Sequence, residues 1–221
     1  MNLEHAKALL ESVKTISERY AEIFKDTKVE YRDFFGYNIG ENTIYIRRYE
    51  SEDIVSEHRD EFVIDYVNEH YGADLSYELD HDDFAFLHEC GHAFQWLMTN
   101  NKEKYLQECR VQREGMNAME QELDPVLVKH SEVINKTCKK INNICDKISN
   151  KKLLYRFFIK HYDKKLDELD TKVNKHFCIY LKVLDIIDGH YRRYPQESFA
   201  DEWACENFEY VVERTYGSWE N

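Results

Sequence analysis

The sequence predicts an α+β fold that is predominantly helical and forms a single domain. Most of the 221 residues fall in segments whose apolar side chains recur every three to four positions, which is the spacing of one helix face. Only two short segments have the composition of strands. Two prolines and seven glycines leave few helix-breaking positions, and a chain of this length can bury one sizeable core.

The first third of the chain is expected to hold a helix, a small sheet and a second helix. Residues 2–26 place apolar side chains at helical spacing, and a second such segment spans residues 52–71. Between them, residues 29–35 and 43–49 are rich in β-branched and aromatic residues, on either side of a glycine-containing turn at 36–40. These two segments are therefore predicted to be strands.

Residues 88–92 read His-Glu-Cys-Gly-His within a segment, 83–99, that its apolar pattern predicts to be a buried helix. His88 and His92 lie four positions apart and so share one helix face. Both imidazoles can then reach one zinc ion while Glu89 points toward its open coordination position. Burying these three side chains in an apolar helix without partners would be costly, which favours a metal. Two core histidines satisfied by hydrogen bonds are the alternative.

Residues 101–190 are predicted to form a helical insertion of three or four long helices without strands. Within it, residues 125–176 hold 13 Lys and Arg against 6 Asp and Glu, a net charge of +7, whereas the other residues carry −20. A solvated helical face is one interpretation of this segregation, and a surface for an acidic partner is the other. The acidity of the remaining chain argues against nucleic acid as the main ligand, because it would repel phosphates.

The last predicted helix runs from Pro195 to Gly217, since proline suits a first helical turn and glycine suits an end. Glu197 and Asp201 lie four positions apart and share one of its faces. A zinc site of the peptidase type needs a third protein ligand. Glu197 could supply it, while Asp201 accepts the free ring N–H of a zinc-bound histidine. The other candidates for the third ligand are carboxylates of a nearer helix and two histidines: Glu108, Glu114, His130 and His190.

The H-E-x-x-H at 88–92 followed by E-x-x-A-D at 197–201 resembles the gluzincin branch of the zincin metallopeptidases, and its surroundings are similar to those of the compact ImmA/IrrE-type peptidases. The resemblance covers about one sixth of the chain and is silent about the substrate. It implies a zincin-like small sheet beside an H-E-x-x-H active-site helix. It also makes His88, His92 and Glu197 the zinc ligands, Glu89 the general base and Asp201 an orienting carboxylate. The 104 residues between His92 and Glu197 depart from the compact families.

The function implied by this resemblance is hydrolysis of peptide bonds in a protein or peptide substrate. Glu89 would take a proton from a metal-activated water. His190, Tyr191 and Tyr194 are the candidates for stabilising the oxyanion, and Tyr194 is the one we select. In such folds an edge strand beside the cleft pairs with an extended peptide, and residues 43–49 are the candidate strand. An ordinary half-buried hairpin is the alternative. A second function class is a non-catalytic interaction protein that uses the insertion as its working surface.

The sequence predicts a soluble cytoplasmic protein with no role at a membrane. Its first residues suit an amphipathic helix without a basic start, and no later run approaches roughly eighteen apolar residues. Neither an export signal nor a membrane span is therefore expected. The six cysteines are scattered without C-x-x-C spacing, which is typical of reduced thiols in a cytoplasmic protein.

Overall fold

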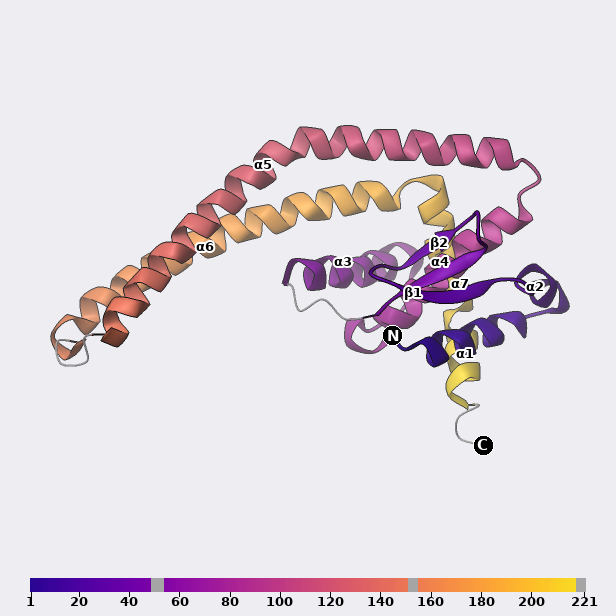
Figure 1. Ribbon diagram of the computed structural model, residues 1–221, viewed down its shortest axis with the longest axis horizontal. Helices are drawn as coiled ribbons and strands as arrows, with labels where there is room; N and C mark the ends of the chain where they lie inside the picture. The colour runs from indigo at the N-terminus through magenta and orange to yellow at the C-terminus, as the bar shows by residue number, and fades with distance from the viewer. Residues whose placement is uncertain (49–53, 151–154, 218–221) are drawn as a thin grey trace. The chain divides into compact units, whose positions relative to one another are not determined.

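The computed structural model describes residues 1–48, 54–150 and 155–217, with the backbone alone within 147–161. The fold is predominantly helical with a small mixed sheet, as predicted (Figure 1). The chain divides into two compact units, which we call the core unit (Met1–Glu114 with Asp188–Asn221) and the hairpin unit (Gly115–Ile187). The two boundaries between the units, after Glu114 and after Ile187, lie inside the insertion predicted for residues 101–190. Residues 101–114 and 188–190 of that predicted insertion therefore belong to the core unit.

The sheet of the core unit has three strands, β1 (Lys28–Arg32), β2 (Gly36–Asn38) and β3 (Thr43–Arg47), in the order β1-β3-β2. β3 is parallel to β1 and antiparallel to β2. The prediction that residues 43–49 form an edge strand is therefore wrong. β2, within residues predicted as a turn, occupies that edge, because three residues are too few for a visible strand pattern. Residue 49 of the predicted strand lies outside the described residues.

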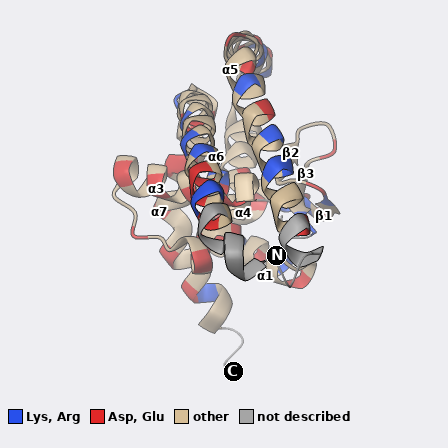
Figure 2. Cartoon of the chain, turned by 90° about the vertical axis from the view of Figure 1, so that its left-hand side faces the viewer, with Lys and Arg blue, Asp and Glu red and all other residues tan. Residues whose placement is uncertain are grey.

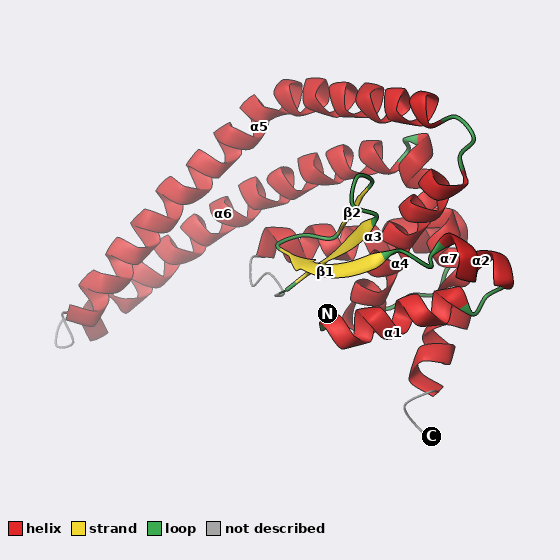
Figure 3. Ribbon diagram, turned by 45° about the vertical axis from the view of Figure 1, so that its right-hand side comes forward, coloured by secondary structure: helices red, strands yellow, loops and turns green. Residues whose placement is uncertain are grey.

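Two helices replace the single helix predicted for residues 2–26. α1 (Leu3–Lys14) ends at Thr15, and α2 (Glu18–Ile23) begins after Ser17, whose side chain accepts a hydrogen bond from the backbone N–H of Tyr20. The apolar spacing continues across this break, so periodicity alone did not reveal it. α1 packs on β1 and α7, and α2 contacts α4 (Figure 3).

The core unit also holds three longer helices, α3 (Ile54–Tyr71), α4 (Tyr77–Met98) and α7 (Pro195–Gly217). α7 has the predicted ends, whereas α4 begins six residues earlier than predicted. α3 is the second predicted helix, and residues 52–53 of that prediction lie outside the described residues. α4 contacts α3, α7 and the strands β2 and β3, so it lies at the centre of this unit. Its buried side chains Phe84, Phe86 and Leu87 belong to one hydrophobic core. Other elements contribute Leu9, Val13, Ile44, Ile46, Trp203 and Val211 to the same core.

α4 and α7 approach each other closely at Gly91. A Cβ atom added there would lie 2.8 Å from the Cα of Ala200 and 3.0 Å from its carbonyl oxygen, closer than packed atoms normally come. The absence of a side chain therefore permits this packing. Gly91 lies between His88 and His92, and Ala200 lies between Glu197 and Asp201, so the same contact brings the two predicted site segments together.

The described part of the hairpin unit is built from two long helices, where three or four were predicted. They are α5 (Lys102–Asn150) and α6 (Tyr155–Arg192); the first 13 residues of α5 and the last five of α6 belong to the core unit. Within the hairpin unit the helices lie side by side, because the Nδ1 atoms of His130 and His176 are 3.0 Å apart. Lysine and arginine residues recur along both helices (Figure 2).

Candidate metal centre

His88 and His92 turn their imidazoles to the same point from one face of α4. Their Nε2 atoms are 3.0 Å apart, as expected for residues one helical turn apart. His88 is buried and His92 is half-buried. Two ring nitrogens this close, both directed toward the same side, can bind one metal ion.

Glu197 of α7 completes a triangle with the two histidines. Its Oε2 atom lies 3.3 Å from the Nε2 atom of each. Ligand atoms at about 2.0–2.1 Å from a tetrahedral zinc are separated by about 3.3–3.4 Å, so the triangle has nearly the dimensions of one zinc site. Among the residues that the structure describes, this is the group of three side chains able to hold a metal ion.

The carboxylate of Glu197 fits a metal for a second reason. Its Oε2 atom is buried and makes no hydrogen bond of normal geometry, which is unfavourable for a charged oxygen unless a cation is close by. Burial alone would raise the pKa of Glu197, but the imidazoles of His88 and His92 hold that pKa well below its usual range. The group therefore stays ionised and can ligate.

Asp201 lies behind His88. Its Oδ1 atom is 2.8 Å from His88 Nδ1 and also accepts a hydrogen bond from Arg192. This contact directs Nε2 of His88 toward Glu197, which is the orienting role predicted for Asp201. Burial opposes protonation of His88, but Asp201 and Glu197 together raise its pKa to about 9. The carboxylates thus favour positive charge at this point, as a metal-binding site requires.

Arg192 was not predicted from the sequence. It is the last residue of α6, and its side chain is largely buried against the fully buried Asp201. A buried carboxylate without a partner would be costly, and the guanidinium of Arg192 supplies that partner for Asp201. The sequence carries a weak signal for this role, since Arg192 immediately precedes the helix that holds Glu197 and Asp201.

Glu89 is half-buried on α4 between the two histidines. Tyr191 lies near it: burial, together with the charges of Glu197 and Glu89, raises the pKa of Tyr191 well above its usual value. Tyr194, the residue predicted for the oxyanion, contacts His190 instead, with its hydroxyl 3.3 Å from Nε2. The structure therefore places Tyr191, rather than Tyr194, against the carboxylates.

The other candidates for the third ligand lie elsewhere. Glu108 accepts a hydrogen bond from the side-chain amide of Gln196 at 3.0 Å, and Glu114 is exposed on α5. His130 lies in the hairpin unit beside His176. Glu197 is the carboxylate that joins the two histidines.

Gln112 is a further contact that sequence reasoning missed. It is buried, and its side-chain amide donates to Oε1 of Glu197 at 2.7 Å. It follows Tyr105 and Cys109 at helical spacing on the buried side of α5. An amide at a position where the pattern expects an apolar side chain was the available signal.

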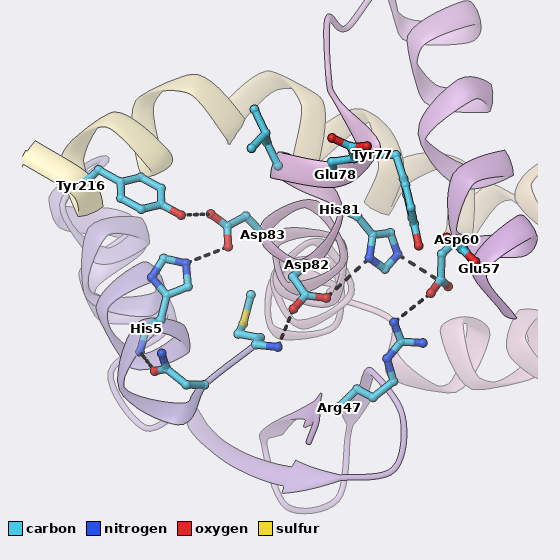
Figure 4. A pocket seen from close by; sticks show the side chains of 13 residues that line it. His5, Arg47, Glu57, Asp60, Tyr77, Glu78, His81, Asp82, Asp83 and Tyr216 are labelled. Atoms are coloured by element: carbon cyan, nitrogen blue, oxygen red, sulfur yellow. Dashed lines mark hydrogen bonds and ion pairs between the residues drawn. The ribbon is translucent and has the colours of Figure 1, made fainter. Parts of the chain in front are cut away.

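A separate cavity of about 800 Å³ lies at the N-terminal end of α4 (Figure 4). Its charged groups are largely paired with one another: Asp83 contacts His5 at 2.7 Å and Tyr216 at 3.3 Å, and Arg47 donates to Asp60 at 2.8 Å. The three residues of the triangle are not among those that line this cavity. The cavity is therefore distinct from the metal centre.

Comparison with protein-family models, curated proteins and solved structures gives no significant match. None of the described helices combines the length and apolar character needed to cross a membrane. The geometry of the centre therefore carries the functional argument.

Proposed function

We propose that this chain is a zinc-dependent metallopeptidase with a gluzincin-type site, in which His88, His92 and Glu197 bind the metal. The observation that carries the proposal is the triangle of two imidazole nitrogens and one carboxylate oxygen, with edges of 3.0, 3.3 and 3.3 Å. Nitrogen and carboxylate ligands in a tetrahedral arrangement are typical of zinc, and three protein ligands leave the fourth position for water. The resemblance of both motif segments to zincins adds support.

The side chains around the triangle suit peptide hydrolysis. A zinc ion bound there would lower the pKa of its water to about 7 and polarise the scissile carbonyl. Glu89, which follows His88 on α4, would accept the proton of that water and return it to the leaving amine. Tyr191 keeps its proton because its pKa is raised, so its hydroxyl can donate a hydrogen bond to the developing oxyanion.

An extended peptide could bind along β2. Strand order makes β2 an edge of the described sheet, and it contacts α4. Main-chain hydrogen bonds to such an edge hold a substrate with little regard for its sequence. β2 therefore takes the role that the sequence had suggested for residues 43–49.

Replacement of Glu89 by Gln tests this function. The variant should bind one zinc ion per chain, like the wild type, because Glu89 contacts the water and not the metal, and it should lose hydrolysis of an unstructured peptide. Zinc is measured by elemental analysis and cleavage by mass spectrometry of the products. Unchanged cleavage by Glu89→Gln would contradict the mechanism.

The second candidate function is a non-catalytic interaction protein in which the metal stabilises the fold. The basic segment 125–176, set against the acidity of the other residues, favours it. In that case the zinc-loaded wild type would cleave no peptide, and an acidic partner would bind the hairpin unit with an affinity that falls as salt rises.

A further inference from the structure

The two oxygens of Glu197 have different surroundings. Oε2 is equidistant from the two imidazoles, at 3.3 Å from each Nε2 atom. Oε1 accepts a hydrogen bond of 2.7 Å from the side-chain amide of Gln112. One oxygen is therefore available to a metal, whereas the other is held by the protein.

Gln112 is fixed by the packing of α5 in the core unit. It is 8% exposed, and Tyr105, two turns earlier on the same side of the helix, is 6% exposed. Leu106 and Val111, on other sides of α5, are exposed. A buried amide is retained in a folded protein only when it is hydrogen-bonded, and Glu197 supplies that partner. The close packing around Gln112 and its hydrogen bond to Glu197 therefore fix the rotamer of Gln112.

The chemical type of each partner matches the role of its carboxylate. Asp201 is paired with the cation Arg192, and this carboxylate contacts the metal centre only through His88. Glu197, which would contact the metal itself, receives a neutral amide. A lysine or arginine in place of Gln112 would neutralise Glu197 and compete with the metal, because opposite charges at hydrogen-bond distance attract strongly in a buried site. A neutral donor holds the carboxylate without removing its charge.

We propose that Gln112 is a positioning residue of the metal centre: by holding Oε1 of Glu197 it directs Oε2 alone to the metal and keeps Glu197 a ligand through one oxygen. The inference rests on the proposed metal site but not on peptidase activity. Partners that orient a metal-bound carboxylate typically contribute roughly 10 to 100-fold to metal affinity.

The variant Gln112→Met tests this role, because methionine is unbranched and of similar volume but cannot donate a hydrogen bond. In the full-length chain, its affinity for zinc, measured by competition with a chromophoric chelator, should fall by roughly 10 to 100-fold. X-ray absorption at the zinc edge should also change, since a released carboxylate can bind through both oxygens.

The matched control is Glu108→Ala. Glu108 and Gln196 form a hydrogen bond of the same kind between the same two helices, at 3.0 Å. Although Gln196 precedes Glu197 in the chain, the carboxylate of Glu108 contacts Gln196 and Lys104 rather than one of the three ligands. We expect zinc affinity within about twofold of the wild type and an unchanged absorption edge. An equal loss in both variants would overturn the proposal, because it would reduce Gln112 to a general packing contact between α5 and α7.

Zinc-loaded wild type provides a measurement that does not depend on how any variant folds. A crystal structure should show Oε2 of Glu197 on the metal and Oε1 on Gln112. Glu197 bound through both oxygens, or wild-type zinc affinity in a folded Gln112→Met, would overturn the proposal. A wild type that binds zinc without cleaving peptides would end the peptidase function alone, and a wild type that binds no zinc would end both.

Discussion

In the core unit, side chains from α1, β3, α4 and α7 meet in one interior where Leu9, Ile44, Phe84 and Val211 have no exposed surface. In the described part of the hairpin unit, the apolar side chains with the least exposure, Ile144, Val183, Leu184 and Ile187, keep 5–8%. Charged residues of both signs recur along both helices of the hairpin unit (Figure 2). The difference arises because a helix with one neighbour can bury only one stripe, whereas α4 has neighbours on several sides.

The two units also treat buried polar groups differently. The core unit pairs each of its buried carboxylates at the metal centre with a specific donor, Glu197 with Gln112 and Asp201 with Arg192. The hairpin unit instead brings together His130 and His176 among lysines. Small changes should therefore have large effects on zinc binding in the core unit and small effects in the hairpin unit.

The largest effect is expected from removing a ligand. Glu197→Ala and His88→Ala should each leave a purified protein without stoichiometric zinc, because two protein ligands do not hold this metal in a site of the structural or catalytic type. Glu114→Ala, on exposed surface of α5, should keep one zinc ion per chain. Elemental analysis of the three proteins checks this, and loss of zinc in Glu114→Ala with retention in Glu197→Ala would reverse the ligand assignment.

Gly91→Ala should cause the next largest effect. The added Cβ would meet the backbone of Ala200 at 2.8 Å, and overpacking of a rigid contact typically destabilises by about 1–3 kcal/mol. Because the helices carrying the ligands would separate, zinc affinity should fall as well. Unfolding in urea and chelator competition measure the two effects.

Gly189→Ala is the control for that change. Gly189 also lies within a helix, but its added Cβ would be 3.5 Å from Cζ of Phe62, an ordinary contact. Alanine is favoured over glycine inside a helix by about 0.5–1 kcal/mol, so this variant should be as stable as the wild type or more stable. Equal destabilisation of both variants would show that the close approach at Gly91 is not the cause.

Replacing residues 125–176 by a flexible Gly/Ser linker should change zinc binding little. All three ligands, as well as Gln112 and Arg192, lie in the core unit, and the stems of α5 and α6 that carry the last two remain. We expect a folded protein with one zinc ion and retained cleavage of a short unstructured peptide. Circular dichroism and chelator competition measure this; an unfolded product would show that the hairpin unit is needed for the core to form.

The smallest effect is expected from titration of the histidine pair in the hairpin unit. Burial, then the positive charges of His130, Lys172, Lys175 and Lys129, lower the pKa of His176. Since the folded-state pKa lies below the unfolded value of about 6.5, the hairpin is most stable above that pH and loses stability as the pH falls through it. An NMR titration of the His176 ring should give a pKa below 6.5, and a value at or above 6.5 would contradict the contact.

The candidate site could be predicted in part because its elements depend on local spacing. The four-residue interval puts His88 beside His92, and Glu197 on the same face as Asp201, in any regular helix. Pro195 and Gly217 likewise mark the ends of α7, since proline suits the first turn and glycine the end. The mostly helical character follows from periodicity over long segments.

Contacts between distant segments could not be predicted in this way. Gln112 is 85 residues from Glu197 in the chain, and nothing in the spacing around either residue indicates that they meet. Tyr191 and Tyr194 were both candidates for the oxyanion, and the sequence could not decide which of them lies near Glu197 and Glu89. Periodicity shows which face of a helix is buried but not which residues cover it.

The sequence by itself determined the mostly helical character, the ends of α7 and the pairs of side chains that share a face of α4 and of α7, because these depend on residues within a few turns of one another. Only the tertiary structure decided that β3 is central, that Gly91 lets α4 meet α7, and that Gln112 and Arg192 hold the two carboxylates. These outcomes depend on strand pairing and on close packing between distant segments. Such packing depends on the shapes of all the side chains that meet there, and no single segment contains that information.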